Sequence, residues 1–376
     1  MHGVPRGTDF APQGSPLTAK QTPVYFRLGA LSSHQRDRRS MDPFARAQHN
    51  AFVSHAVDRV HSRRVDASWL TDSQSSPNTR YVVVWQDEIL LQSGVGCAPT
   101  PDQGDLLHLQ HYSKSELTDL QQQCPGQPAD VVLLGTLGDV TYFAVGIGDT
   151  CDVVGRGLCN GGQFLDLRGA ATRLDHEEGA LAAQAKAMVH WHRQHRFCGH
   201  CGSPMQSEEG GYQLRCTNDA CGQVHFPRVD PAIIVLVVSG ERCLLGRQPR
   251  WPGTRYSNIA GYVEPGESLE TAVAREVAEE AGVVIRSVEY HSSQPWPFPQ
   301  ALMVGFTAEA ETDAIRLNDG ELEDARWFTR AEMCAGLTSG SLTLPSPTSI
   351  SFHLIEDWFD QGGCGRLRTL VAEMPG

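Results

Sequence analysis

Three glutamates close together in the sequence, Glu276, Glu279 and Glu280, have the residue type and spacing to bind a metal ion. They lie in a stretch from Leu269 to Ala281 that is predicted to be a helix, because it is rich in helix-forming residues and Gly282 follows as a stop. Glutamates four residues apart on a helix repel each other, and burial increases that cost. Hard carboxylate oxygens suit Mg²⁺ or Mn²⁺, so the pattern predicts a divalent cation here.

The angular positions of the glutamates around this helix can be compared with those of its apolar residues. At about 100° per residue, they fall within one arc that overlaps or adjoins the apolar positions, which are Leu269, Val273 and Val277. Arg275 is expected on the opposite side. The carboxylates are therefore expected along the edge of the packed face. The alternative is a solvated acidic face, which the apolar overlap and the preceding Gly/Pro loop disfavour.

Four cysteines form a second group with the spacing of metal ligands. Cys198 and Cys201 make one pair, Cys216 and Cys221 another, fourteen residues lie between the pairs, and a glycine follows the second cysteine each time. Four thiolates can close a tetrahedral structural zinc site, so one Zn²⁺ per chain is predicted. His200 is a rival ligand, and two disulfides or free thiols are the other alternative. Because a closed site has no open position, this zinc is expected to hold structure.

A proline-rich segment that begins at Ser293 carries two large aromatic residues, Trp296 and Phe298, between three prolines. Proline stiffens the chain, so the rings could be preset to stack on a nucleobase while Gln294 and Gln300 read its edge. A polyproline-type segment packed on the body of the protein is the alternative. The residues by themselves give the two interpretations similar weight.

The elements around these residues indicate several domains. Residues 1–22 are predicted to be a disordered leader and 23–173 an α+β domain, in which two hairpins are expected at 81–92 and 131–145. A connecting helix is expected within 174–197, with Asp175 as its N-cap and Glu178 at capping-box spacing. A zinc ribbon should span 198–226. Strands and helices then alternate over 227–376 without regular βαβ spacing, which favours a mixed sheet between helices, an α/β/α sandwich.

Composition excludes some classes of function. The chain has 376 residues, 40% of them hydrophobic, and a formal net charge of −13. This charge argues against a broad electrostatic grip on nucleic acid or anionic membrane. No apolar run is long enough to span a membrane, and the odd count of 11 cysteines cannot close into a complete disulfide framework. A cytoplasmic protein with no membrane partner is expected.

The stretch from Gly261 to Val283 resembles the Nudix hydrolase box, with every fixed position of G-x5-E-x7-R-E-apolar-x-E-E-x-G-apolar present. The resemblance implies that Glu276, Glu279 and Glu280 are catalytic metal ligands. It further implies that the backbone carbonyl of Ala260 completes the coordination and that a salt bridge from Glu267 to Arg275 braces the loop.

The segment SQPWPFP, with a four-cysteine ribbon ahead of the box, resembles the NADH pyrophosphatases of that family, which also remove NAD caps from RNA. The resemblance implies a homodimer and a further metal ligand at Glu321. It also implies substrate contacts at Phe226, Tyr262, Gln294, Pro295, Trp296, Pro297, Phe298, Pro299, Gln300, Ala301 and Ser351.

The leading hypothesis is therefore metal-dependent hydrolysis of the pyrophosphate bond of NAD(H), and removal of NAD caps from RNA 5′ ends. A second is a broader hydrolase of ADP-ribose or other dinucleotides. A third, of another class, is a zinc-ribbon protein that binds nucleic acid and has an inactive Nudix domain. The complete glutamate set argues against the third.

Overall fold

The structure is a computed structural model that describes residues 42–93, 106–124, 131–318 and 320–372. The predicted leader, residues 1–22, lies outside these ranges, as does the beginning of the predicted N-terminal domain. Among the described residues, every helix is too short or too polar to cross a bilayer.

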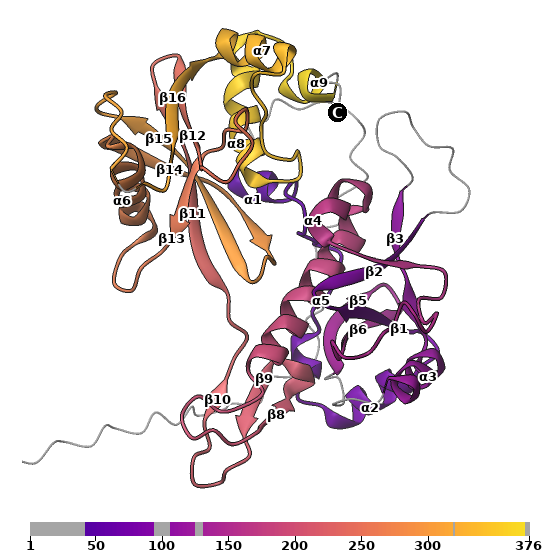
Figure 1. The fold of residues 1–376 in the computed structure, drawn as a ribbon. Coiled ribbons are helices and arrows are strands. Elements are labelled where there is room, and N and C mark those ends of the chain that lie inside the picture. The colour runs from indigo at the N-terminus through magenta and orange to yellow at the C-terminus, as the bar shows by residue number, and fades with distance from the viewer. Residues whose placement is uncertain (1–41, 94–105, 125–130, 319, 373–376) are drawn as a thin grey trace, which may run out of the picture. The chain divides into compact units, whose positions relative to one another are not determined.

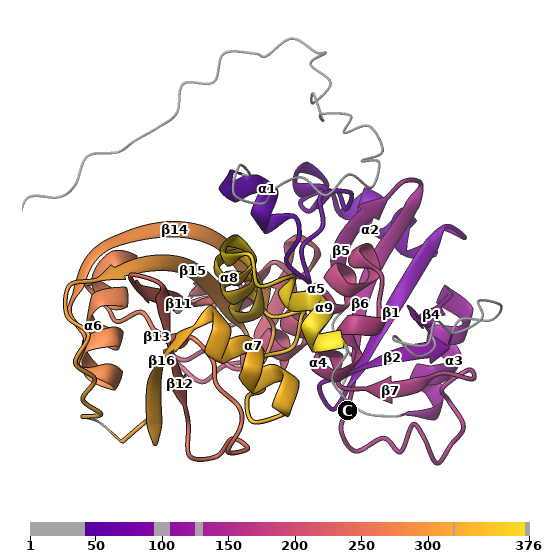
Figure 2. The same cartoon turned by 90° about the horizontal axis from the view of Figure 1, so that it is seen from above.

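The N-terminal domain contains a mixed sheet with helices on both faces (Figures 1 and 2). Its strands are β1 (Thr79–Trp85), β2 (Glu88–Ser93), β3 (Leu107–Leu109), β4 (His111–Tyr112), β5 (Val131–Leu137), β6 (Val140–Ile147) and β7 (Gln163–Leu165). The helices of this part are α1 (Pro43–Ala47), α2 (Ala67–Ser75), α3 (Lys114–Gln123), α4 (Leu167–Ala170) and α5 (His176–Gln194). The strand order is β3-β2-β1-β6-β5, in which β1 and β6 are parallel. Alternate residues of β1 enter two cores, so Val82 packs with residues of α5 and Val83 with residues of α3.

Helix α5 belongs to this domain as well as linking it to the ribbon, because its alanine and leucine side chains complete the core beneath β1 and β6. Asp175 caps it and accepts a hydrogen bond from the Glu178 N–H at 2.8 Å. The other half of the predicted capping box is replaced, because the Glu178 carboxylate accepts from the Leu109 N–H and pairs with His108.

The ribbon is an antiparallel sheet of β8 (Met205–Glu208), β9 (Gln213–Cys216) and β10 (Val224–His225). Two tight turns present its cysteine pairs. Gly202 and Gly222 follow these pairs with φ of 74° and 60°, a left-handed conformation that glycine adopts without steric cost.

The C-terminal domain has a mixed sheet between two helical layers, as the sequence predicts. Its strands are β11 (Asp230–Ser239), β12 (Arg242–Arg247), β13 (Ile259–Tyr262), β14 (Ile285–Trp296), β15 (Ala301–Ala310) and β16 (Asp324–Thr329). Its helices are α6 (Leu269–Ala281), α7 (Arg330–Ser339), α8 (Ile350–Phe359) and α9 (Leu367–Ala372). The order is β14-β15-β11-β12-β16, with β13 also paired to β11 and with β11 parallel to β15.

The central strand β11 shows why its sequence is an unbroken apolar run. Ile233 and Val235 pack in the core beneath α6, whereas Ile234 and Leu236 pack in the core beneath α8. Figure 1 shows α6 on one side of the sheet and α7 and α8 on the other. A strand buried on both faces needs apolar residues at every position.

The two sheets repeat one topology, which the sequence does not reveal. In each, a hairpin (β1–β2 or β11–β12) pairs in parallel with the second strand of a later hairpin (β5–β6 or β14–β15), and a helix lies between the hairpins in the chain. In the N-terminal copy that helix is α3. It carries two carboxylates, Glu116, which completes a capping box with Ser113, and Asp119, whereas α6 carries four glutamates.

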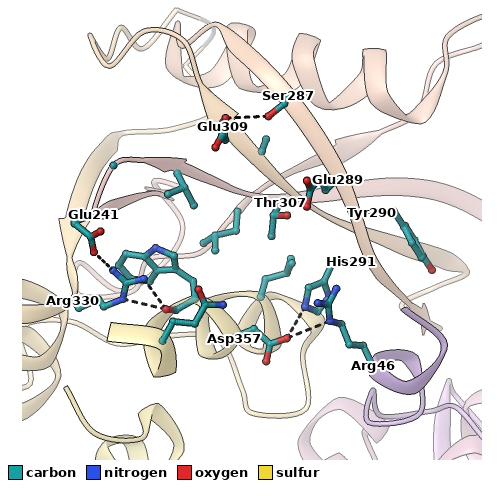
Figure 3. A pocket seen from close by; sticks show the side chains of 17 residues that line it. Arg46, Glu241, Ser287, Glu289, Tyr290, His291, Thr307, Glu309, Arg330 and Asp357 are labelled. Carbon is teal, nitrogen blue, oxygen red and sulfur yellow. Dashed lines mark hydrogen bonds and ion pairs between the residues drawn. The ribbon is translucent and has the colours of Figure 1, made fainter. Parts of the chain in front are cut away.

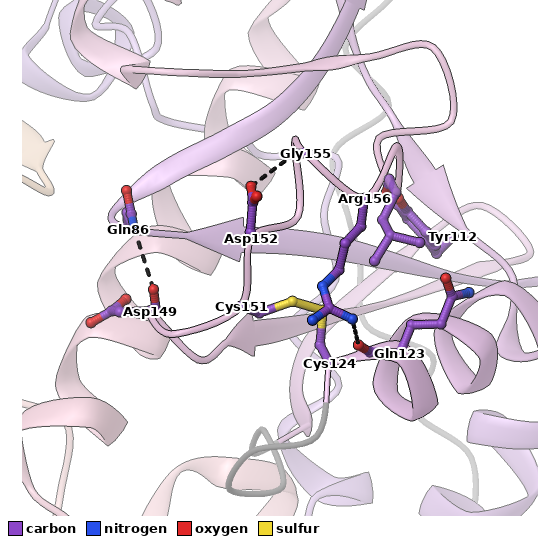
Figure 4. The surroundings of a disulfide bond; sticks show 10 residues. Gln86, Tyr112, Gln123, Cys124, Asp149, Cys151, Asp152, Gly155 and Arg156 are labelled. Carbon is purple, nitrogen blue, oxygen red and sulfur yellow. Dashed lines mark hydrogen bonds between the residues drawn. A yellow bond between two sulfur atoms is a disulfide. The ribbon is translucent and has the colours of Figure 1, made fainter.

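A disulfide joins Cys124, at the end of α3, to Cys151 in the loop after β6 (Figure 4). Arg156 of the same loop donates a hydrogen bond to the Gln123 carbonyl at 2.9 Å, so the loop is tied to the helix twice. This bond was not predicted from the cysteine pattern. The odd cysteine count excludes a complete framework but not a single pair.

Candidate active site

The connection from β13 to α6 is built so that a carboxylate can lie against the sheet backbone. A Cβ atom on Gly261 would lie 2.0 Å from Oε1 of Glu276, so only glycine leaves room for this side chain. Helix α6 begins after Ser268, which forms a capping box with Thr271. It ends at Gly282, whose φ of 68° gives the left-handed cap that the sequence predicts.

Arg275 makes five hydrogen bonds, three to the connection between β13 and α6 and two to glutamates of its own helix. It donates to both carboxylate oxygens of Glu267, at 3.0 and 2.6 Å, and to the carbonyl of Tyr262 at 3.0 Å. Its Nη1 atom donates to Glu276 at 2.9 Å and to Glu279 at 3.0 Å. The prediction that Arg275 lies on the opposite side of the helix is wrong. Residues four apart differ by only about 40° around a helix, and the long side chain folds toward Glu279.

Burial separates the three glutamates of α6 that are predicted to bind metal. Glu276 is 9% exposed and Glu280 3% exposed, whereas Glu279 is on the surface. Desolvation raises the pKa of Glu276, the Arg275 guanidinium opposes that change, and the charges of Glu279 and Glu321 add to it. Carboxylate oxygens are the ligands that Mg²⁺ and Mn²⁺ prefer, but among the described residues these glutamates do not form a ligand group as compact as that of the ribbon cysteines.

The other predicted residues come from β13, the segment before β16 and the end of the ribbon. Ala260 is in β13, directly before Gly261, and Glu321 is an exposed residue just before β16. Tyr262 is 58% exposed, and Phe226, directly after β10, is 65% exposed. Large aromatic side chains with this exposure have a free face to stack on a base.

Two predicted substrate contacts, Gln294 and Ser351, are buried and make hydrogen bonds to other parts of the chain. Gln294 is 0% exposed, and its amide donates to the carbonyls of Ala51 and Thr348 and accepts from the Ile350 N–H at 2.8 Å. Ser351 is 2% exposed and shares a hydrogen bond with the Ser257 hydroxyl at 2.9 Å. In this arrangement both side chains fix the start of α8, so neither reaches a ligand directly.

The rest of the proline-rich segment is a strand end and a turn. Pro295 and Trp296 end β14, and Gln300 donates to the Asp230 carboxylate at 3.1 Å just before β15 begins at Ala301. No strand was predicted for this proline-rich segment. Strand β14 is at the edge of its sheet, where the missing N–H of Pro295 costs no ladder bond. Trp296 and Phe298 are partly buried against the N-terminal core, while Pro297 is buried and Pro299 exposed.

The four ribbon cysteines converge. Their sulfur atoms all lie within 4.8 Å of one another, with 3.8 Å between Cys198 and Cys221 and 3.4 Å between Cys201 and Cys216. This group contains no histidine, and the rival ligand His200 is exposed. Hydrogen bonds from Ser203 lower the pKa of Cys201 to about 6, whereas the pKa values of Cys216 and Cys221 are raised, so Cys201 is the first of these thiols to ionise. The arrangement fits a closed structural zinc site.

The histidines at the end of α5 connect that helix to its neighbours. His192 is buried and bonds the Gly211 carbonyl at 2.8 Å, and His195 bonds the Trp191 carbonyl. His190 lies 3.6 Å from the Asp87 carboxylate.

A cavity of about 470 Å³ lies on the α8 side of the C-terminal sheet (Figure 3). Its lining includes Glu289 and His291 of β14, Asp357 of α8 and Arg46 of α1. None of the predicted site residues lines it, so this cavity is not the candidate active site.

Comparisons with known proteins cover most of the chain. The NUDIX domain matches residues 228–343, the NADH pyrophosphatase zinc ribbon domain 193–226, and the NADH pyrophosphatase-like rudimentary NUDIX domain 78–191. The rudimentary NUDIX match over residues 78–191 agrees with the sheet topology that the N-terminal domain shares with the C-terminal domain. A solved NUDIX hydrolase from Nitrosomonas europaea is 22% identical with a TM-score of 0.32, covering 36% of this chain and 79% of that chain, a likeness too weak to carry an argument.

Curated relatives match over longer stretches. The NAD-capped RNA hydrolase NUDT12 of Macaca fascicularis is 33% identical over 344 residues, covering 82% of this chain and 73% of the relative. The NAD-capped RNA hydrolase NudC of Mycobacterium bovis is 42% identical over 206 residues, covering 52% of this chain and 65% of the relative. The chain therefore belongs to the Nudix hydrolase family, and within it to the zinc-ribbon subgroup of NADH pyrophosphatases and NAD-capped RNA hydrolases.

Proposed function

We propose that the chain hydrolyses the pyrophosphate bond of NAD(H), giving AMP and nicotinamide mononucleotide, and that it removes NAD caps from RNA 5′ ends. The single observation that carries this proposal is the Glu276 carboxylate of α6, which Arg275 holds and which lies against Gly261. It belongs to a chain that matches the NADH pyrophosphatase zinc ribbon and rudimentary NUDIX domains and is similar to NAD-capped RNA hydrolases.

The reaction needs a cation and a base. Glu276, Glu279, Glu280 and Glu321, with the Ala260 carbonyl, would hold Mg²⁺ or Mn²⁺, which screens the diphosphate charge and activates water when bound. Water adds to one phosphorus, the bridging P–O bond breaks, and the bridging oxygen leaves with the second mononucleotide. A carboxylate of this set takes the proton from the water. The Arg275–Glu267 pair acts by holding the loop so that Glu276 keeps its place.

Substrate recognition falls to exposed or partly exposed aromatic residues in this proposal. Tyr262 and Phe226 offer open ring faces, and Trp296 and Phe298 form a preset pair 5.0 Å apart between centroids. Gln300 and the flanking prolines shape the turn. Gln294 and Ser351 act indirectly, by positioning α8.

The remaining parts of the proposal concern the whole protein. Cys198, Cys201, Cys216 and Cys221 bind one structural Zn²⁺, and the protein works as a homodimer in the cytoplasm. The Cys124–Cys151 disulfide weighs against the cytoplasmic location, because reducing compartments keep such thiols reduced.

The test compares four substrates, which are NADH, NAD⁺, ADP-ribose and NAD-capped RNA, each with Mg²⁺ or Mn²⁺ and with a chelator. We expect metal-dependent AMP and reduced nicotinamide mononucleotide from NADH, and 5′-monophosphate RNA from capped RNA. Cleavage of ADP-ribose alone would replace the proposal with a broader dinucleotide hydrolase. No cleavage of any substrate by folded, zinc-loaded protein would refute it.

A further inference from the structure

A short segment ahead of the N-terminal sheet, Asn50 to Phe52, packs on the last part of β14; we call these three residues the strap. Asn50 is 1% exposed, and its amide donates to the Ser293 carbonyl at 2.8 Å and to the Ser292 hydroxyl at 3.1 Å. In the opposite direction, the Gln294 amide donates a hydrogen bond to the Ala51 carbonyl at 3.2 Å. Each segment thus satisfies the other's buried polar groups, which fixes their register.

The third strap residue contacts both aromatic residues of the proline-rich segment. The ring of Phe52 lies 6.3 Å from that of Trp296 and 6.0 Å from that of Phe298, at interplanar angles of 60° and 66°. Phe52 is 5% exposed and has a φ of 69°, a conformation that bulky residues rarely adopt. Surrounding contacts must hold a residue in such a conformation, and backbone strain of this kind is common where a fold positions a functional group.

Two cations of the N-terminal domain approach the same rings. The Arg168 guanidinium lies 4.5 Å from the Phe298 ring centroid and 5.6 Å from that of Trp296. The ammonium of buried Lys186, on α5, lies 5.7 Å from the Phe298 ring. Cations above a ring face favour one ring orientation, so they restrict where Phe298 can turn.

The strap is itself anchored to the C-terminal domain beside the cavity of Figure 3. Asp357 of α8 accepts from His291 at 2.8 Å and lies 4.0 Å from Arg46 of α1, and His291 bonds the Ser292 hydroxyl at 2.9 Å. Ser292 in turn accepts from Asn50. One chain of polar contacts therefore runs from α8 through β14 to the strap.

We propose that the strap and Arg168 are positioning residues that set the orientation of Trp296 and Phe298 and thereby the affinity for the dinucleotide. The inference rests on the proposed function, and it gives the catalytically silent N-terminal region a role at the substrate site. Phe52 acts through the two rings and does not touch the reacting atoms.

The test replaces Phe52 with glycine. If Phe52 were only a turn residue, Phe52→Gly would relieve the strained φ and leave substrate binding unchanged. Under the proposal, loss of two aromatic contacts frees the rings, so the KM for NADH rises about tenfold while kcat stays within about twofold. Amide hydrogen exchange over residues 293–301 should become faster. Arg168→Gln, a surface change that leaves the strap intact, should raise the KM less, by about threefold.

The matched control is Asn160→Gly, an exposed residue with φ of 47° in a loop of the N-terminal domain, which should leave KM and exchange at wild-type values. Unchanged exchange in folded Phe52→Gly protein would overturn the proposal, and so would faster exchange with an unchanged KM. Wild-type protein that fails to cleave NADH would refute the proposed function instead, which is a separate result.

Discussion

Single side chains determine how closely the carboxylates of α6 can approach the sheet. Gly261 provides the space and Arg275 the charge, and both act on Glu276. The sequence identifies these residues because their types and spacing are restrictive. It does not show that Arg275 reaches Glu276 and Glu279, because a helical projection locates Cα atoms and not the end of a long side chain.

We expect Gly261→Ala to reduce kcat about a hundredfold, because the new Cβ displaces the Glu276 carboxylate by an ångström or more. Stability should fall by no more than about 1 kcal/mol, since the displaced group is the end of a flexible side chain. Steady-state kinetics and urea unfolding measure the two effects. Gly148→Ala, at an exposed glycine with open space around its Cβ, is the control. Normal kcat in Gly261→Ala would contradict the placement of Glu276.

Arg275→Lys should lower kcat/KM about tenfold or more. An ammonium group cannot make the two-pronged contact to Glu267 and reach Glu276 and Glu279 as well. The control is Arg286→Lys, in which an exposed pair with Glu309 is exchanged in the same way and no change is expected. Equal activity of the two variants would show that Arg275 supplies only a diffuse positive charge.

At the scale of elements, the ribbon, α6 and the apolar strands were predictable because each has a strong local pattern. Helix α6 has the bounds that the sequence predicts, and the four cysteines converge. Strand β14 was not predicted, because two register shifts break its alternation of buried and exposed residues and Pro295 lies near its end. The functions of Gln294 and Phe52 were also hidden, since their partners are more than fifty residues away.

Cys216→Ser should release the zinc and unfold the ribbon, because a closed site depends on all four thiolates. Metal analysis and thermal unfolding measure this, with Cys334→Ser on α7 as the control that keeps full zinc content. One equivalent of zinc in folded Cys216→Ser protein would disprove the four-thiolate site.

At the scale of the molecule, two domains share one sheet topology. The C-terminal domain carries the carboxylate set of α6, and the N-terminal domain has no such set on the corresponding helix, α3. No local pattern in the sequence signals this repeat, because its unit is an entire domain and its side chains have diverged. The disulfide lies within the copy that lacks the set, where Cys124 and Cys151 join the end of α3 to the loop after β6.

Replacing both Cys124 and Cys151 with serine should lower the free energy of unfolding by about 3 kcal/mol, as the loop between them is 27 residues long. Denaturant unfolding without reductant measures the loss. In the presence of reductant the wild type should match the variant. If the two already unfold alike without reductant, the bond contributes no stability.

The central claim is that the carboxylates of α6 hold the cation that drives cleavage of NADH. The most direct measurement is AMP release from NADH by the wild type and by Glu280→Gln, with Mg²⁺ or Mn²⁺ and with a chelator. Glu270→Gln, at an exposed glutamate in the first turn of the same helix, is the matched control. We expect metal-dependent AMP from the wild type and from Glu270→Gln, and a loss of at least about a thousandfold in folded Glu280→Gln protein. AMP release by Glu280→Gln at the wild-type rate, or release that persists in chelator, would contradict the account.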